Sequence, residues 1–288
     1  MRRLALGTAQ FGLDYGIANS AGKVDGAAIA RILARARQGG VDTLDTAIAY
    51  GDSEARLGAA GLAGWRVITK LPAMPAEVDD VTAWVETSIA ASLQRLGIAR
   101  LEAVLLHRSG DLLGERGETL ARSLEGLVKA GLTGCVGVSI YDPSELDSLW
   151  PRWKPQVVQA PFNVLDRRLL SSGWLPRLGQ HGIRVHVRSV FLQGLLVMEP
   201  ARRPAWFSRW SALLDEWHDW CAANSVTPAA AALAFVDAQE QIERFVMGID
   251  SLQQLEQLLQ PAPAVPLPPA QLASEDRELL EPSRWRLA

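Results

Sequence analysis

The chain has 288 residues, of which 48% are hydrophobic, so it can bury a large core as one domain or two. Its formal net charge is −3, and its basic residues form no stripe, which argues against a dedicated nucleic-acid-binding protein. The chain lacks the roughly 18 consecutive apolar residues of a membrane span.

The N-terminal stretch "MRRLALGTAQFG" has too short an apolar run for a signal peptide and is predicted to be a first strand. The two cysteines, Cys135 and Cys221, suggest no disulfide framework and have no metal-ligand spacing, so they are expected to be buried thiols. We therefore expect a soluble cytoplasmic protein with no metal, membrane or nucleic-acid partner.

Short apolar runs alternate with helical patterns along the whole chain. The helical stretch 81–97 places Val81, Val85 and Ile89 on one face and ends at Gly97. Eight runs are predicted strands: Leu4–Leu6, Val41–Asp45, Arg66–Lys70, Leu101–His107, Gly134–Ser139, Gln156–Gln159, Ile183–Ser189 and Phe245–Ile249. This alternation predicts an α/β fold, a (β/α)₈ TIM barrel forming one domain over residues 1–288, with a doubly wound open sheet as the alternative.

The glycine pattern does not favour the open sheet as a dinucleotide-binding fold. The stretch "GLTGCVG" has its glycines at 131, 134 and 137, which is the wrong spacing for the G-x-G-x-x-G fingerprint. From about Pro261 the chain is rich in proline, and an irregular tail is expected there.

Polar residues stand where three predicted strands end. They are Asp45, Lys70 and His107, and Tyr50 follows on the loop after the second strand. Each of these residues also has a purely structural interpretation. Asp45 is then a helix cap, Lys70 a surface lysine, His107 a histidine bonded to the backbone, and Tyr50 a ring packed in its loop. Because barrel chemistry lies at the C-terminal strand ends, and the chain has only four lysines and three tyrosines, their joint placement favours a catalytic set.

These residues lie in motifs that resemble those of aldo-keto reductases. The stretches are "LDTAIAYG" with Asp45 and Tyr50, "VITKLP" with Lys70, and "LLHRS" with His107. Similar stretches also occur at the first strand ("LGTAQFG"), at 137–139, at 157–165 and at 247–258, so that the resemblance covers about residues 4–260. It implies a (β/α)₈ barrel and a catalytic set of Asp45, Tyr50, Lys70 and His107.

The implied reaction explains these residue types. Reduction of a carbonyl requires a hydride on carbon, supplied by the cofactor, and a proton on oxygen, supplied by the protein. A cation beside a phenol stabilises the phenolate, so Lys70 would tune Tyr50 as the general acid, and Asp45 would hold Lys70 in place. His107 would donate to, or orient, the substrate oxygen.

The resemblance also implies a nicotinamide cofactor, NADP or NAD. The residues that it assigns to the cofactor are Gly7, Thr8, Ala9 and Asp45 at the first two strands, Ser139 and Gln159 near the carboxamide, Arg188 and Ser189 along the ring and pyrophosphate, and Gly248, Asp250 and Gln254 at the adenosine end. Three positions depart from the family pattern. Ile140 replaces the usual asparagine, Arg188 replaces the usual aromatic residue, and Met247–Leu258 contains no cation for a 2′-phosphate. We therefore predict weak discrimination, with NADH used at least comparably to NADPH, unless Arg202 or Arg203 reaches the phosphate.

The sequence also bears on three other functions. A short-chain dehydrogenase needs Y-x-x-x-K on one helix, whereas Tyr50 and Lys70 are twenty residues apart. A metal-dependent barrel hydrolase would need more strand-end ligands. A nucleotide-sensing regulatory subunit built on the reductase barrel is the alternative that remains. The short, polar loop after the fourth strand favours a small polar aldehyde, ketone or sugar, and the tail is expected to cover the substrate pocket. The oligomeric state is left open.

Overall fold

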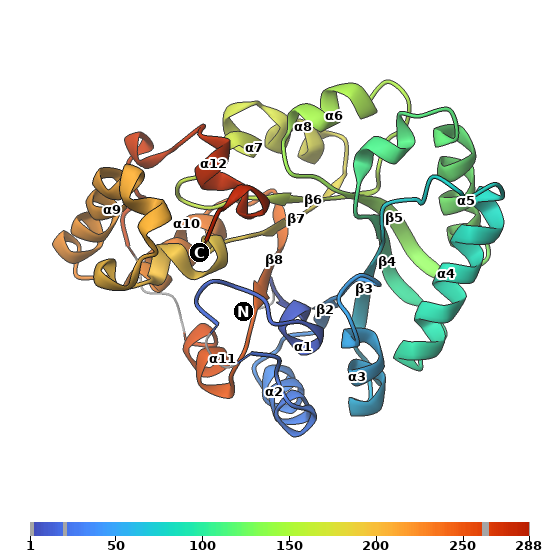
Figure 1. Ribbon diagram of the computed structural model, residues 1–288, viewed down its shortest axis with the longest axis horizontal. Coiled ribbons are helices and arrows are strands. Elements are labelled where there is room, and N and C mark those ends of the chain that lie inside the picture. The colour runs from blue at the N-terminus through green and yellow to red at the C-terminus, as the bar shows by residue number, and fades with distance from the viewer. Residues whose placement is uncertain (1–2, 20–21, 261–264, 288) are drawn as a thin grey trace.

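The computed structural model describes residues 3–19, 22–260 and 265–287. Eight parallel strands close into a barrel in the order β1 to β8 (Figure 1). They are β1 (Leu4–Gly7), β2 (Thr43–Asp45), β3 (Arg66–Leu71), β4 (Leu101–Leu106), β5 (Thr133–Ser139), β6 (Val157–Pro161), β7 (Arg184–Arg188) and β8 (Ile242–Gly248). The predicted (β/α)₈ barrel is confirmed, and the open sheet is wrong because β1 pairs with both β2 and β8.

Helices surround the barrel (Figure 1). The α-helices are α1 (Ala9–Gly12), α2 (Gly26–Gln38), α3 (Ser53–Ala60), α4 (Val81–Leu96), α5 (Gly117–Lys129), α6 (Ser144–Leu149), α7 (Arg168–Ser171), α8 (Trp174–Gln180), α9 (Ser211–Ala223), α10 (Pro228–Asp237), α11 (Leu252–Leu258) and α12 (Arg277–Leu280). Short 3₁₀ helices are η1 (Ser109–Leu112), η2 (Leu192–Val197), η3 (Pro200–Arg202), η4 (Ala205–Trp210), η5 (Ala270–Leu272) and η6 (Pro282–Arg284).

Helix α4 shows how the sequence sets the ends of an element. The Asp80 carboxylate accepts a hydrogen bond from the Ala83 amide at 2.9 Å and caps the first turn. Gly97 ends the helix with a φ of 65°, a left-handed conformation that glycine adopts without strain. Between them, Val85 and Ile89 are buried as the periodicity predicts.

The barrel interior is apolar in its middle and polar at its C-terminal mouth. Ile68, Ala103, Leu105, Cys135 and Val157 form a separate apolar cluster. Because alternate residues of a strand share a face, the positions two residues further along β3, β4 and β6 continue the same inward rows. Those positions are Lys70, His107 and Gln159, so the strand geometry itself brings polar side chains to the mouth.

The C-terminal tail is partly ordered into short helices. Residues 261–264, where the tail was expected to begin, lie outside the described residues. From residue 265 onward the chain forms η5, α12 and η6, and Leu272, Leu279 and Leu280 are buried. Two further contacts attach the tail. The Ser274 amide donates to the Leu165 carbonyl, and the Trp285 ring packs edge-on against Phe207 at 4.9 Å.

Candidate active site

Lys70 and Asp45 form a buried ion pair at the barrel mouth. The Lys70 Nζ donates to Asp45 Oδ1 at 2.5 Å and to the Thr46 carbonyl at 2.9 Å. The two side chains are only 1% and 3% exposed. Burial by itself would lower the pKa of Lys70, but the charges of Asp45 and Tyr50 outweigh it, and the pKa lies above its ordinary value. Lys70 is therefore a cation throughout the neutral range.

Tyr50 lies directly beside this cation. The Lys70 Nζ is 5.1 Å from the centroid of the Tyr50 ring, and the ring meets that of His107 edge-on with centroids 5.9 Å apart. The structure thus brings together all four residues that the sequence predicted to be catalytic. They come from β2 and the loop behind it, from β3, and from the residue that follows β4.

The loop that carries Tyr50 is fixed by close packing against α1. A Cβ on Gly12 would lie 1.8 Å from the Tyr50 carbonyl oxygen, so only glycine fits there. On the other side of the loop, the Ser53 hydroxyl donates to the Thr8 carbonyl at 2.9 Å. The Thr8 hydroxyl in turn donates to the Asp45 carbonyl at 3.1 Å, so this side chain braces the loop that carries Tyr50.

His107 follows β4 directly; the strand ends at Leu106, one residue earlier than predicted. Its amide donates to the Leu71 carbonyl at 2.9 Å, which continues the pairing with β3. Burial, followed by the positive charges of Lys70 and Arg188, lowers the pKa of His107 to about 4. The imidazole is therefore neutral near pH 7 and can donate a hydrogen bond without carrying a charge.

Gln159 and Ser139 are neighbours in the β5–β6 register at the mouth. Both are buried, and the Gln159 Nε2 donates to Asp45 Oδ2 at 2.7 Å. Asp45 thus has one oxygen on Lys70 and the other on Gln159, which fixes the orientation of its carboxylate. The sequence did not foresee this contact, because the two residues are 114 positions apart.

A second group of polar residues, Tyr15, Tyr141 and Arg188, borders the mouth. The sequence motifs included neither Tyr15 nor Tyr141. Tyr15 and Tyr141 are 42% and 41% exposed. The guanidinium of Arg188 lies over the Tyr141 ring at 4.5 Å, and the Tyr15 hydroxyl accepts from Gln193 at 3.2 Å. Electrostatic interactions connect Tyr15 with Tyr50, so all three tyrosines of the chain gather at one end of the barrel.

The ends of β1 and β8 form a glycine-lined cradle beside these residues. Gly7 and Gly248 are register partners, and a Cβ on Gly248 would come within 2.5 Å of the Gln10 amide. Within the described part of the chain, the buried Gln10 Oε1 has no hydrogen-bond partner. The Gln10 amide thus packs directly on Gly248, and its unsatisfied acceptor suits a ligand hydroxyl, such as those on the riboses of a dinucleotide.

The segment after β8 uses several of its polar groups internally. The Gln254 side chain accepts from the Asp250 amide at 3.1 Å, and the Ser251 hydroxyl caps α11. Glu256 forms a bidentate pair with Arg35 at 2.6 and 2.8 Å. Of the two loop arginines considered for a 2′-phosphate, Arg203 pairs with Asp215 at 2.5 Å.

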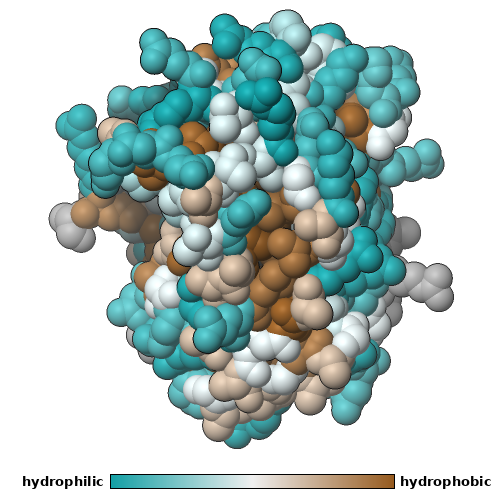
Figure 2. Space-filling view, turned by 90° about the vertical axis from the view of Figure 1, so that its right-hand side faces the viewer, coloured by the Kyte–Doolittle hydropathy of each residue, from teal (hydrophilic) through white to brown (hydrophobic). Residues whose placement is uncertain are grey.

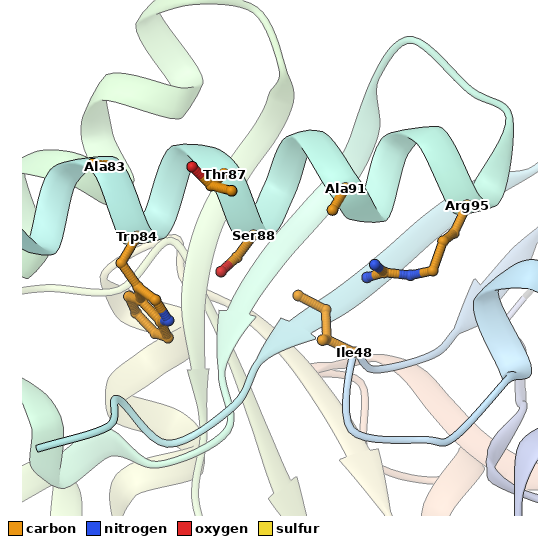
Figure 3. Close-up of a pocket in the computed structure, with 7 residues that line it drawn as sticks. All are labelled: Ile48, Ala83, Trp84, Thr87, Ser88, Ala91 and Arg95. Atoms are coloured by element: carbon orange, nitrogen blue, oxygen red, sulfur yellow. The ribbon is translucent and has the colours of Figure 1, made fainter. Parts of the chain in front are cut away.

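A cavity of about 490 Å³ lies next to the site but outside it. Trp84, Ser88 and Arg95 project from α4 toward Ile48 on the loop after β2 (Figure 3). On this side of the molecule, apolar surface is flanked by hydrophilic side chains (Figure 2). None of the four predicted catalytic residues lines this cavity, so it is separate from the barrel mouth.

No group of three His, Cys, Asp or Glu residues among the described residues is arranged to hold a metal ion. No helix in the described part of the chain is long and apolar enough to cross a membrane. Cys135 and Cys221 are buried free thiols, as predicted.

Comparison with known proteins decides the family. The sequence pattern of the aldo/keto reductase family matches residues 3–277. The chain belongs to the aldo/keto reductase family. The predicted family resemblance is confirmed.

Individual relatives are distant. The NADH-specific methylglyoxal reductase of Escherichia coli is 27% identical over 187 residues, which cover 59% of this chain and 57% of that protein's length. The aldo-keto reductase AKR11C1 from Bacillus halodurans, in its holo form, superposes with a TM-score of 0.76 at 21% identity, covering 98% of this chain and 95% of that one. The glycerol dehydrogenase AKR11B4 from Gluconobacter oxydans gives a TM-score of 0.68 at 22% identity, with 89% and 85% covered. These two structures support the fold alone.

Proposed function

We propose that the protein reduces a small carbonyl compound to the alcohol with a reduced nicotinamide dinucleotide, and that Tyr50 is the general acid. One observation carries the proposal. A buried Lys70–Asp45 pair places a permanent cation 5.1 Å from the ring of Tyr50, next to a histidine, at the mouth of a reductase-family barrel. The reverse reaction, alcohol oxidation, would use the same groups with Tyr50 as the base.

Each of the four residues has a distinct part in the proton transfer. The Tyr50 hydroxyl donates its proton to the substrate oxygen, and the Lys70 ammonium stabilises the phenolate that is left. Asp45 holds the ammonium in place and balances its charge. Neutral His107 donates a hydrogen bond to the same substrate oxygen, which polarises the carbonyl without competing for the proton.

The nicotinamide cofactor, when bound, supplies the hydride. The cradle at Gly7 and Gly248 suits the dinucleotide, and Ser139 and Gln159 are proposed to face its carboxamide. Arg188, Ser189, Asp250 and Gln254 remain proposed contacts along its length. Thr8 and Ala9 are buried, so they are proposed to support the cofactor site indirectly. The Thr8 hydroxyl does so by bonding to the Asp45 carbonyl, at the start of the loop that carries Tyr50.

NADH is proposed to be used at least as well as NADPH. Asp250 can accept from a ribose 2′-hydroxyl, whereas a 2′-phosphate needs cations. Arg203 is committed to Asp215, and Arg35 to Glu256. The E. coli relative is named as NADH-specific, in line with this proposal.

The substrate is proposed to be a small polar aldehyde, ketone or sugar, with the tail covering part of its pocket. The tail reaches the rim through Arg277, which pairs with Asp142 at 2.5 Å, next to Tyr141. The polar character of the mouth, with three tyrosines, a histidine and an arginine, supports a polar substrate over an apolar one.

The test is a panel of aldehydes, ketones and sugars, with each reduced nucleotide followed by its absorbance. The proposal expects oxidation of the nucleotide that depends on the carbonyl compound and stops in Tyr50→Phe. A protein that binds nucleotide tightly but oxidises none with any carbonyl would contradict the proposal and favour a nucleotide-sensing regulatory subunit.

A further inference from the structure

Arg188 carries a positive charge to the mouth of the barrel without a carboxylate partner. Its Nη2 donates to the Ile140 carbonyl at 3.1 Å, its Nη1 donates to the Ser189 hydroxyl at 3.3 Å, and its Cζ lies 4.5 Å from the centroid of the Tyr141 ring. No Asp or Glu of the described residues lies within ion-pair distance. Since a guanidinium has five N–H donors, three remain for another acceptor.

Two other buried or half-buried arginines that lie inside the barrel wall or against it are compensated by carboxylates, whereas Arg167 donates only to backbone carbonyls. Arg168 meets three carboxylates, those of Asp142, Asp166 and Glu281, at 2.8–3.5 Å. Arg184 meets Glu102 at 2.8 Å and Glu243 at 2.7 Å. Arg188 differs from Arg168 and Arg184 in having no carboxylate to balance its charge, and a bound anion would supply that charge.

The groups around Arg188 suit an anion close to the reacting carbonyl. Its charge acts on His107 and on Tyr15, so it lies near the groups that would hold the substrate oxygen. Tyr15 and Tyr141 are both more than a third exposed and offer phenol hydroxyls at the same mouth. One guanidinium and two hydroxyls are the donors that carboxylates and phosphates bind in proteins.

We propose that Arg188, with Tyr15 and Tyr141, binds an anionic group of the substrate, so that the preferred substrates are small aldehydes or ketones carrying a carboxylate or a phosphate ester. This inference rests on the proposed reductase function and specifies its substrate class. The diphosphate of the nucleotide offers the same chemistry to Arg188, and the experiment separates the two sources.

The experiment compares substrates in matched pairs that differ in charge. Succinic semialdehyde is paired with its methyl ester, and glyceraldehyde 3-phosphate with glyceraldehyde. The quantity measured is the ratio of kcat/KM for the anionic member to that for the neutral member. In Arg188→Gln this ratio is expected to fall about 10- to 100-fold, as for loss of one charge-assisted hydrogen bond, mainly through KM for the anion. Arg188→Lys is expected to retain part of the preference for the anionic substrate.

Arg177→Gln is the matched control. Arg177 is also an arginine stacked on an aromatic ring, 4.2 Å from the centroid of Trp174, but it lies on the outer helix α8. This variant changes the net charge equally and is expected to leave the ratio unaltered. The dissociation constant for NADH, measured by its fluorescence, reports on the nucleotide in every variant.

The outcomes are distinct. An unchanged ratio in Arg188→Gln, with weaker NADH binding, would overturn the inference and assign the arginine to the nucleotide. If the wild type reduces neither these four aldehydes nor any carbonyl compound of the wider panel, the proposed function fails by itself. Calorimetric titration with malonate in the presence of NADH then still tests the anion site. Binding that is lost in Arg188→Gln supports the site, and no binding to the wild type contradicts it.

Discussion

The two ends of the barrel both hold buried or half-buried charges, but they balance them differently. At the N-terminal end, Arg184 faces two carboxylates, and the side chains of Arg184, Glu102 and Glu243 are 28%, 26% and 32% exposed. At the C-terminal mouth the Lys70–Asp45 pair is almost fully buried, and Arg188 has no carboxylate partner among the described residues. Charges are neutralised and partly hydrated at one end, whereas the other keeps cations beside a tyrosine and a histidine.

Two histidines on the inner face of the barrel show the same contrast. His107 lies among cations, and its pKa is lowered to about 4 by burial, Lys70 and Arg188. His186 is completely buried in the middle of β7, with its Nε2 3.6 Å from Glu243 near the N-terminal end. Burial alone would raise the pKa of Glu243, but its interactions with His186 and Arg184 hold that pKa well below its usual range. The N-terminal end therefore favours a stable ion cluster, and the mouth favours neutral donors around a reacting group.

The largest effects are expected from the ion pair at the mouth. Lys70→Met leaves the Asp45 charge buried without its partner, so the free energy of unfolding should fall by about 3–5 kcal/mol. Activity should fall by about 10²–10⁴ because the phenolate of Tyr50 loses its cation. Asp45→Asn should also lower the free energy of unfolding and the activity. In the double variant, the loss of each should be smaller than the sum of the two single losses. Denaturant unfolding and kcat/KM measure both quantities; strict additivity would mean that the two residues act separately.

A smaller and pH-dependent effect is expected from His107. Its pKa is about 4 in the folded chain, against about 6.5 when unfolded, so the unfolded state binds the extra proton. The stability that this difference provides is present above about pH 6.5 and is lost as the pH falls toward 4, by at most about 3 kcal/mol. The difference in unfolding free energy between wild type and His107→Asn should show this slope. Parallel curves for the two proteins would contradict the assigned environment.

A substitution at the N-terminal end of the barrel should lower the stability of the protein but leave its activity nearly unchanged. Arg184→Met removes the partner of two carboxylates that are a quarter to a third exposed, so a loss of about 1–3 kcal/mol is expected. Activity should stay within about twofold of the wild type once both proteins are folded. Thermal unfolding and kcat/KM at a permissive temperature measure the two. A large loss of kcat in a fully folded variant would break the proposed division between the ends.

The smallest effect concerns the 2′-position of the nucleotide. Because the segment after β8 lacks cations and Arg203 is paired, NADH and NADPH should bind with similar affinity. Fluorescence titration of both nucleotides measures this. Binding of NADPH more than a hundredfold tighter, about 2.8 kcal/mol, would require a cation from another segment.

The sequence could predict the strand ends but not the contacts between distant loops. Asp45, Lys70 and His107 were found because a parallel barrel brings all strand ends to one rim, whatever the details of packing. Tyr15 and Tyr141 were missed because their approach to Arg188 depends on the paths of two loops. The Arg35–Glu256 pair joins residues 221 positions apart, and no local pattern signals it.

The most direct test of the central claim is the rate of a single turnover in Tyr50→Phe. Enzyme saturated with NADH is mixed with a carbonyl substrate that the wild type reduces, and the loss of nucleotide absorbance is followed in time. The account predicts an unchanged dissociation constant for NADH and a rate lower by about 10²–10⁴, because only the proton donor is removed. A rate within a few-fold of the wild type would show that another group protonates the substrate, and would contradict the role assigned to Tyr50.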